Sequence, residues 1–262
     1  MPGLPRNRGV AYTLRVAKQT KPKAKKKARQ PERPRRFRRL VRWVLRWGAR
    51  LAGLLVLIVL LVVAAHSRFN PTLGYYMWTE EQRLGEIDRV WVPISEIAPA
   101  MARSVVAAED ANFCNHWGFD MAAIRAALAD GGRRGGSTLT QQVVKNVYLW
   151  HGRSWARKAL EALLTPVVEI LWSKRRIVEV YLNIAEFDEG VFGVEAAARH
   201  YFGVGPEALS DLQAARLAAV LPAPQSWSAS RPSDQVRNRT KKILSGAATI
   251  AVDGRAACFE RP

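Results

Sequence analysis

Two adjacent carboxylates begin the part of the sequence that is best suited to chemistry. Glu109 and Asp110 precede Phe113, His116 and Gly118 in one short segment. A carboxylate beside a histidine and aromatic side chains is suited to general acid or base catalysis. A structural interpretation also fits, in which Glu109 is exposed, Asp110 caps a turn and His116 bonds to local backbone. The segment alone leaves both interpretations open.

A second segment, 135–146, carries glycines and hydroxyls at a predicted helix start. Free backbone N–H groups at such a start can hold an anion, and Lys145 would add a positive charge. The alternative is an ordinary helix cap followed by a solvated polar face. The candidate binding residues here are Ser137, Thr138, Thr140, Gln141, Gln142, Lys145 and Asn146.

Two further segments are informative only in combination with the first two. Residues 153–161 contain three bases and Glu161, and Arg157 and Glu161 share a helix face because they are four residues apart. A surface ion pair worth about 0.3 kcal/mol is the alternative. Residues 174–183 look like an ordinary amphipathic helix before a glycine-rich turn. The candidates in these segments are Arg153, Arg157, Lys158, Glu161, Glu179, Tyr181 and Asn183.

The elements that must position these residues are predicted to be helices. Pro99 suits the start of a helix that ends near Glu109, and Asp120 and Ser137 are predicted helix caps. Ser154 should open a longer helix. Its predicted buried stripe is Trp155, Leu160, Leu163, Val167 and Leu171. Further helices are predicted around 174–182, 194–201, 211–221 and 233–250, with one short strand at 89–94. The predicted fold class is therefore all-α.

The positive charge is confined to the N-terminus. Residues 1–50 hold 18 of the 41 lysines and arginines against the single acid Glu32, although the formal net charge is +19. The rest of the chain is nearly neutral, whereas nucleic-acid-binding proteins usually spread their charge over the folded surface. We therefore expect no nucleic acid partner and a disordered basic tail over residues 1–46.

An apolar run follows this tail and predicts one transmembrane helix over 47–67. Residues 51–67 contain no Asp, Glu, Lys or Arg, and Trp43 and Trp47 suit the membrane interface. A cleaved signal peptide is the alternative, but the basic tail is far longer than a signal peptide's charged region. The positive-inside rule predicts a cytoplasmic N-terminus and a domain over 68–262 that faces the periplasm or the cell exterior. The expected location is the inner membrane.

Two features of the exported part bear on its surroundings. Residues 69–88 are rich in aromatic and apolar side chains, which predicts packing along the membrane face of the domain. Cys114 and Cys258 lie 144 positions apart. One disulfide between them is compatible with an oxidising compartment, but two free thiols are the favoured prediction.

The four polar segments, taken in order, resemble the family-51 glycosyltransferases. The motifs are E-D-x-x-F-x-x-H-x-G-x-D from Glu109, G-G-S-T-x-T-Q-Q-x-x-K-N from Gly135, R-K-x-x-E from Arg157 and K-x-x-I-x-E-x-Y-L-N from Lys174. The resemblance covers about residues 90–224 and is greatest to the monofunctional biosynthetic transglycosylases. It implies a lysozyme-like helical domain with a small membrane-facing lobe. Departures at Gln213, Val204 and Val178 fall outside the candidate site.

The resemblance also implies a mechanism. Glu109 would be the general base for polymerisation of lipid II, a lipid-linked disaccharide, with release of undecaprenyl diphosphate. Lys145 and Arg153 match positions that hold the diphosphate, with Arg157 and Lys158 beside them. Glu161 matches a second essential, catalytic carboxylate, which we expect to organise these cations or a divalent metal, with direct proton transfer as the alternative. The implied substrate-binding residues are Asp110, Phe113, His116 and the other candidates of the three later segments.

Cofactor and partner expectations follow from the same resemblance. No cofactor is required, a divalent cation such as Mg²⁺ or Mn²⁺ is compatible with a diphosphate substrate, and no dedicated metal-ligand cluster is visible. The expected partners are lipid II, the growing glycan strand and the lipid bilayer, with cell-wall synthases or divisome proteins as candidate protein partners. The 262 residues leave no space for a transpeptidase domain and contain no S-x-x-K tetrad, so we expect no transpeptidation.

Two other functions remain as alternatives at this point. A lytic transglycosylase or muramidase would cleave glycan strands with a similarly placed glutamate. A non-catalytic scaffold for cell-wall assembly would keep the fold without turnover. The sequence does not predict processivity, strand length, metal dependence or oligomeric state.

Overall fold

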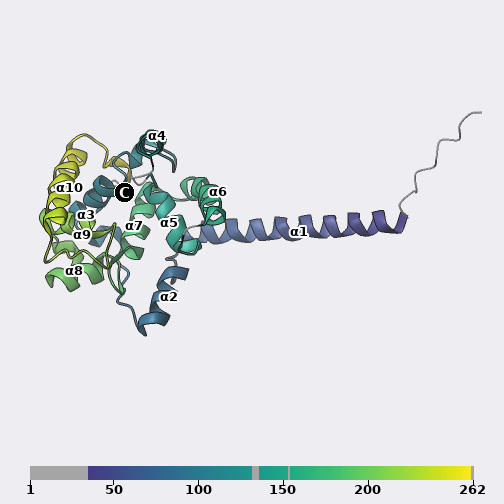
Figure 1. The fold of residues 1–262 in the computed structure, drawn as a ribbon, viewed down its shortest axis with the longest axis horizontal. Coiled ribbons are helices and arrows are strands. Elements are labelled where there is room, and N and C mark those ends of the chain that lie inside the picture. Colours follow the sequence, from purple (N-terminus) through teal and green to yellow (C-terminus); the bar gives the residue numbers. More distant parts are fainter. Residues whose placement is uncertain (1–34, 132–135, 153, 261–262) are drawn as a thin grey trace, which may run out of the picture. The chain divides into compact units, whose positions relative to one another are not determined.

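The computed structural model describes residues 35–131, 136–152 and 154–260 (Figure 1). Arg153, a candidate site residue, therefore lies outside the described residues. Helices dominate these ranges, so the all-α prediction is confirmed. The elements are α1 (Arg35–His66), α2 (Tyr75–Leu84), η1 (Ile94–Glu96), α3 (Pro99–Glu109), η2 (Phe113–Asn115), α4 (Met121–Ala129), α5 (Leu139–Tyr148), α6 (Trp155–Leu171), α7 (Lys174–Ile184), β1 (Glu186–Asp188), β2 (Val191–Phe192), α8 (Val194–Phe202), η3 (Pro206–Ala208), α9 (Asp211–Val220), α10 (Asp234–Val252) and α11 (Ala257–Glu260).

The chain divides into two compact units, residues 1–52 and 53–262, and the boundary falls inside α1. The described part of the first unit is the N-terminal portion of α1. Within α1, the stretch Arg38–His66 is long and apolar enough to cross a membrane by length and composition. The predicted boundaries of tail, transmembrane helix and exported domain stay predictions.

The last turn of α1 packs within the second unit. Val63 is fully buried, and its carbonyl accepts a hydrogen bond of 2.8 Å from Nε1 of Trp172. The carbonyl of His66 accepts a second bond, of 3.1 Å, from Nε of Arg176. His66 Nδ1 also lies 3.0 Å from the hydroxyl of Tyr148. These contacts tie the end of α1 to α5, α7 and the residue that follows α6.

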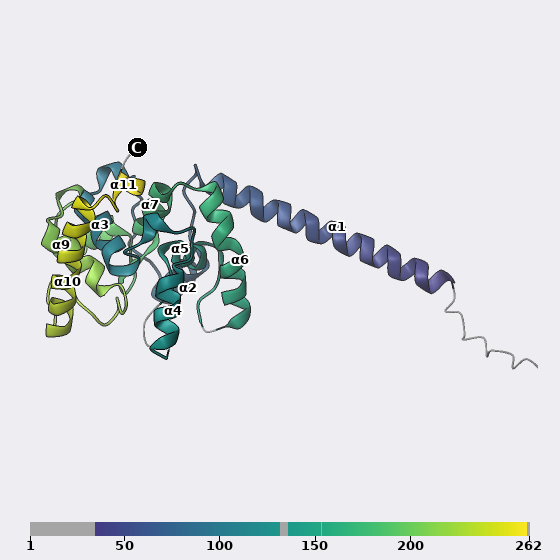
Figure 2. The ribbon, with the colours of Figure 1, turned by 90° about the horizontal axis from the view of Figure 1, so that it is seen from above.

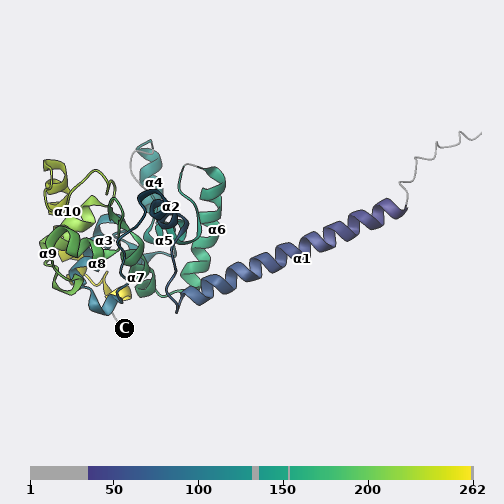
Figure 3. The same cartoon turned by 90° about the horizontal axis from the view of Figure 1, so that it is seen from below.

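The second unit is built around two groups of helices. The helices α3, α9 and α10 pack on one another, and α5 packs on both α6 and α7. All three views show α9 and α10 on one side of α5 and α7, with α6 at the opposite edge (Figures 1, 2 and 3). Seven of the eleven residues of α7 are buried, which makes it the central helix of the core.

The strand predicted at 89–94 is wrong. The two strands found in the described residues are β1 and β2, which pair antiparallel, and only Asp88 joins them through an isolated bridge to Val191. The backbone of Val92 bonds instead to one side chain. Asn183 accepts from the N–H of Val92 at 2.8 Å and donates to its carbonyl at 2.9 Å. An asparagine amide thus takes the place of a neighbouring strand.

The helix starts were mostly predicted correctly. Asp120 caps α4 by accepting from the N–H groups of Ala122 and Ala123, and Ser154 caps α6. The prediction for Ser137 is wrong by one residue. Thr138 caps α5 in a capping box, in which its side chain accepts from Gln141 N and the Gln141 side chain accepts from Thr138 N. This reciprocal pair satisfies two free donors, which a cap at Ser137 would not do.

The predicted buried stripe of α6 is also wrong. Trp155 is 92% exposed and Leu163 is 69% exposed, whereas Glu161, Thr165, Val168 and Glu169 are the buried residues of this helix. Helical periodicity located an apolar face but could not decide which way it points. The polar face turns inward because its carboxylates meet buried cations and hydroxyls, described below.

The expectation of two free thiols is wrong as well. Cys114 and Cys258 form a disulfide, with their Cα atoms 5.6 Å apart. The bond joins η2, immediately after the Glu109 segment, to α11 at the C-terminal end. Two further contacts hold the same segments together: Arg255 Nη1 donates to the carbonyl of Ala111 at 3.1 Å, and Arg103 pairs with Glu260. The separation of 144 positions between the two cysteines gave no indication that they lie close together.

Candidate active site

Glu109 is the last residue of α3, and both of its carboxylate oxygens are held from other helices. Oε2 accepts a bond of 2.9 Å from the side-chain amide of Gln142 on α5. Oε1 accepts a bond of 3.2 Å from Nη2 of Arg239 on α10. The side chain of Glu109 is 17% exposed. A carboxylate held on two sides and still open to solvent is suited to taking a proton from a bound hydroxyl.

A third helix reaches Glu109 through Gln142. The hydroxyl of Tyr181 on α7 donates to Oε1 of Gln142 at 3.2 Å, and this fixes the amide so that its nitrogen faces Glu109. Burial raises the pKa of Tyr181 well above its usual range, and the Glu109 carboxylate adds to this effect. Tyr181 therefore stays protonated and acts as a donor in this chain.

Asp110 and His116 support the backbone around the base. Oδ2 of Asp110 accepts from the N–H of Leu139 at 3.0 Å, and Oδ1 lies 2.8 Å from Nε2 of His116. The N–H of Gly118 donates to Nδ1 of His116 at 3.2 Å. This pattern assigns a neutral imidazole whose Nε2–H donates to Asp110. The two residues join the end of α3 to the start of α5.

Several other candidates are buried and bonded within the protein. Thr138 donates to the carbonyl of Gly118 at 2.8 Å. Thr140 donates to Glu169, a buried carboxylate that the sequence did not single out and that also pairs with Lys174 at 2.9 Å. Lys174 Nζ lies 4.2 Å from the ring centroid of the fully buried Phe113. These contacts lie within the fold, and direct contact with substrate stays a prediction for Thr138, Thr140 and Phe113.

Glu161 on α6 pairs with two cations of the same helix. It is only 2% exposed, and its carboxylate accepts a 2.8 Å bond from Nη1 of Arg157 and a short bond from Nζ of Lys158. Lys158 also donates to the hydroxyl of Ser137 at 3.2 Å. The ion pair is thus buried at its acidic end, unlike the solvated surface pair that was the alternative interpretation. A buried carboxylate requires such partners.

Both carboxylates, Glu109 and Glu161, affect the pKa of Lys145. Burial lowers the pKa of its ammonium, Glu161 and Glu109 oppose this effect, and Arg157 and Lys158 add to it. Gln142, Lys145 and Asn146 occupy one face of α5, three and four residues apart. Lys145 therefore shares a helix face with the residue that bonds Glu109.

Glu179 and Asn183 are bonded elsewhere in the fold. Glu179 Oε2 accepts from the N–H of Ile94 at 2.9 Å, and its other oxygen pairs with Arg176. Asn183 holds Val92, as described above. Their hydrogen bonds to Ile94 and Val92 and the ion pair with Arg176 give these two candidates a role in placing the segment before α3.

A hollow of about 210 Å³ opens beside Glu109. It lies between the end of α3, the segment that follows it and the start of α5. Its lining residues are Glu109, Asp110, Ala111, Asn112, Asp120, Ala123, Gly136, Ser137 and Thr138. The lining is polar and carries carboxylate, amide and hydroxyl groups, which are suited to hydrogen bonding with sugar hydroxyls.

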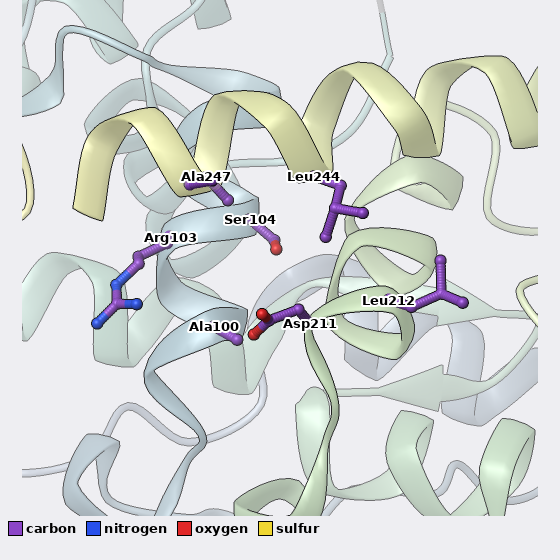
Figure 4. A pocket seen from close by; sticks show the side chains of 8 residues that line it. Ala100, Arg103, Ser104, Asp211, Leu212, Leu244 and Ala247 are labelled. Atoms are coloured by element: carbon purple, nitrogen blue, oxygen red, sulfur yellow. The ribbon is translucent and has the colours of Figure 1, made fainter. Parts of the chain in front are cut away.

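A larger hollow of about 340 Å³ lies elsewhere, between α3, α9 and α10 (Figure 4). The close-up shows Arg103 and Ser104 from α3, Asp211 from α9 and Leu244 from α10 around it. Its lining contains none of the candidate site residues. Nine residues separate Ala100, which lines it, from Glu109, and this spacing places them on opposite faces of α3. We therefore place the active site at the smaller hollow.

Sequence reasoning missed Arg239 and His151. Arg239 lies 130 residues beyond Glu109 and outside the four motifs, and its only signal is its position beside the buried stripe of α10. His151 stacks on Tyr76 with ring centroids 3.9 Å apart. Burial, with Lys145 and Arg157 nearby, lowers its pKa to about 4, so it is neutral at pH 7. Nothing in the sequence indicated this stacking.

Among residues 35–131, 136–152 and 154–260, no three His, Cys, Asp or Glu side chains are placed together to hold a metal ion. Glu109, Asp110 and Glu161 are instead each paired with a basic side chain. The site therefore combines one open carboxylate with a set of cations around a second, buried carboxylate.

Comparison with known proteins identifies the family. Residues 79–248 match the transglycosylase family. The chain is 60% identical over 207 residues to a biosynthetic peptidoglycan transglycosylase of Jannaschia sp. (strain CCS1), which covers 79% of this chain and 86% of that protein. A protein of the same name from Stutzerimonas stutzeri (strain A1501) is 50% identical over 197 residues, 72% of this chain and 81% of the relative. The chain belongs to the peptidoglycan transglycosylase family, and its helical domain is the lysozyme-like domain of that family.

Proposed function

We propose that this transglycosylase polymerises lipid II into glycan strands, with Glu109 as the general base. The observation that carries the proposal is the position of Glu109: it opens on a polar hollow while Gln142 and Arg239 hold its two oxygens. The relatives named as biosynthetic peptidoglycan transglycosylases support the substrate class.

In the proposed reaction, the 4-hydroxyl of the acceptor sugar attacks the anomeric carbon of the donor. Glu109 takes the hydroxyl proton as the new oxygen–carbon bond forms. The bond from the anomeric carbon to the diphosphate breaks, and the diphosphate leaves with the electron pair. Attack opposite the leaving group inverts the anomeric configuration. One base is sufficient because diphosphate, unlike a sugar hydroxyl, leaves without protonation by an acid.

The cations around Glu161 are proposed to receive the diphosphate. Lys145, Arg157 and Lys158 can stabilise the negative charge that develops on the leaving oxygens, and Arg157 presents a planar fork to them. Glu161 is too deeply buried to reach a sugar, so its proposed role is to hold Arg157 and Lys158 in place. Arg153 is proposed as a further diphosphate ligand on the motif alone.

The apolar outer faces of α2 and α6 are proposed to lie against the membrane. On α2, Tyr75 is 54% exposed and Trp78 is 49% exposed, while Met77 points inward. On α6, Trp155, Leu163 and Ile170 point outward. Apolar surface of this extent suits a lipid interface. We propose that α1 spans the inner membrane with its N-terminus in the cytoplasm, so that the domain works in the periplasm where its lipid-linked substrate is anchored.

We further propose that the chain has no transpeptidase activity, because its sequence contains no S-x-x-K tetrad. Incubation of the purified protein with a fluorescent penicillin measures this directly. We expect no covalent label on the chain. A label that survives denaturation would contradict the proposal.

Incubation of the detergent-solubilised full chain with labelled lipid II tests the main proposal. We expect glycan polymer from the wild type, none in the presence of moenomycin and none from E109Q. The exposed Glu96 supplies a matched control, since E96Q makes the same chemical change away from the hollow. Release of muropeptides from preformed glycan would instead indicate a cleaving enzyme. A well-folded wild type without either activity would indicate a scaffold.

A further inference from the structure

The Glu109 carboxylate needs external support because of its place in the helix. Glu109 is the last residue of α3, and the next residue, Asp110, has left the helical conformation with φ −160° and ψ 68°. The last carbonyls of a helix have no partner further along it, and helix ends fray. The helix alone therefore does not fix where the side chain of its final residue points.

Arg239 supplies support from a helix that lies outside the four sequence motifs. Its Nη2 donates to Oε1 of Glu109 at 3.2 Å and lies 3.5 Å from the carbonyl of Ala108. One guanidinium nitrogen thus contacts both the base and a terminal carbonyl of the helix that carries it. A cation at a helix C-terminus is also favourable to the helix dipole.

Close packing of α10 on α3 fixes where Arg239 can reach. A Cβ added at Gly246 would lie 3.3 Å from the Cβ of Ala107, so the two helices approach closely there. Arg239 precedes Gly246 by seven residues, two helical turns, and so lies on nearly the same face of α10. The guanidinium is therefore delivered to the end of α3 by a rigid helix contact.

The orientation of the guanidinium that brings Nη2 to Glu109 leaves another of its nitrogens without a hydrogen bond to any described residue. Within the part of the chain that the structure describes, Nε of Arg239 is buried without a hydrogen-bond partner. A buried donor without a partner is unfavourable, and such a group in a folded protein calls for a functional or structural reason. The contact of Nη2 with Glu109 provides that reason.

We propose that Arg239 is a positioning residue of the polymerisation reaction, which fixes Oε1 of Glu109 from α10 while Gln142 fixes Oε2 from α5. The inference rests on the proposed function, in which Glu109 is the base. Two bonds from two helices hold the carboxylate in the orientation that meets the acceptor hydroxyl. The C-terminal helix α10 is accordingly part of the machinery that presents the base.

Steady-state kinetics on the full chain in detergent tests this inference. In R239Q the carboxylate loses one of its two supports, and we expect kcat to fall by about 10²-fold, the scale expected for misplacement of a reacting group by about 1 Å. KM for lipid II should stay near the wild-type value, because Arg239 acts through Glu109. R239K keeps the charge without the planar fork, so its kcat should lie between the two. Lys242 is an exposed cation on the same helix, and K242Q should match the wild type.

The outcomes separate positioning from a general effect on structure. Wild-type kcat in R239Q, an equal loss in K242Q, or a rise in KM without a fall in kcat would each overturn the inference. Thermal melting identifies any variant that fails to fold. If R239Q does not fold, R239K decides: a lower kcat at unchanged KM supports positioning, and an unchanged kcat contradicts it. Absence of polymer from the wild type would remove the proposed function, and the positioning of Glu109 with it.

Discussion

Glu109 and Glu161 are both carboxylates with cationic partners, yet their surroundings suit different tasks. Glu109 has one arginine and one neutral amide as partners and opens on a hollow. Glu161 has an arginine and a lysine and is almost fully enclosed. A proton acceptor must reach its substrate, whereas a carboxylate that organises cations need not. The two environments therefore favour acid–base work for Glu109 and electrostatic work for Glu161.

The pH dependence of the reaction should reveal whether Lys145 acts through its charge. Its pKa is lowered mainly by burial, so it loses its proton at a lower pH than an ordinary lysine. If its charge holds the diphosphate, kcat/KM should fall as the pH rises toward that lowered pKa. In K145R the guanidinium stays charged, so this alkaline fall should be absent even where the absolute rate is reduced.

Rates for lipid II polymerisation between about pH 7 and 10 measure this difference, because kcat/KM reports groups of the free enzyme. The exposed Lys241 gives the control, since K241R should keep the wild-type profile. An identical alkaline fall in K145R would assign the titration to another group.

Residues within a motif of fixed spacing could be predicted from the sequence, whereas residues that act through distant contacts could not. Glu109, Gln142 and Tyr181 belong to motifs of fixed spacing, and the structure brings all three together. Arg239 and His151 could not be predicted, because their roles depend on tertiary contacts between segments far apart in the chain. A basic residue such as Arg239 at the edge of an apolar helix stripe gives only a weak signal of such a contact.

Helices show the same difference between local signals and tertiary contacts. Helix starts were predictable because caps are local: Asp120 and Ser154 bond to the backbone within three residues. The inward face of α6 was not predictable, because periodicity gives the spacing of an apolar stripe but not its direction. Glu161 and Glu169 face inward because Lys158, Arg157 and Lys174 pair with them there. On this helix, ion pairing of the carboxylates thus outweighed the usual burial of apolar side chains.

The disulfide between Cys114 and Cys258 should stabilise the contact between η2 and α11. It closes a loop of 144 residues between η2 and α11. Such a bond restricts the unfolded chain, and its removal typically costs about 2–4 kcal/mol of stability. In a C114S/C258S double variant we expect the melting temperature to fall. Activity at elevated temperature should fall with it, because η2 adjoins the Glu109 segment.

Thermal melts with and without reductant measure the effect. The wild type should lose stability when reduced, and the double variant should not respond to reductant. Denatured, unreduced wild type should also show no free thiol toward a labelling reagent. Two reactive thiols in that sample would contradict the pairing.

At the scale of the whole molecule, α1 is long and apolar enough to cross a membrane, and its last turn belongs to the same compact unit as Glu109. Within the second unit, the last turn of α1 is bonded to Trp172 and Arg176. Trp172 directly follows α6, whose outer face is apolar. In the proposed function the substrate is anchored in the membrane, so contacts that hold the domain against lipid should assist its capture.

Substitution of the outer face of α6 tests this arrangement. Leu163 and Ile170 are 69% and 73% exposed and lie two turns apart on one face. In L163Q/I170Q, KM for lipid II should rise several-fold in proteoliposomes, because each substitution removes apolar area worth on the order of 1 kcal/mol or more at a lipid interface. In detergent micelles the rates should match the wild type, since micelles adapt to the altered surface. Val252 on α10 is 85% exposed and supplies the control V252Q, which should behave as wild type in both settings. An equal loss in micelles and bilayers would show that the outer face of α6 serves folding or catalysis directly instead of contact with the membrane.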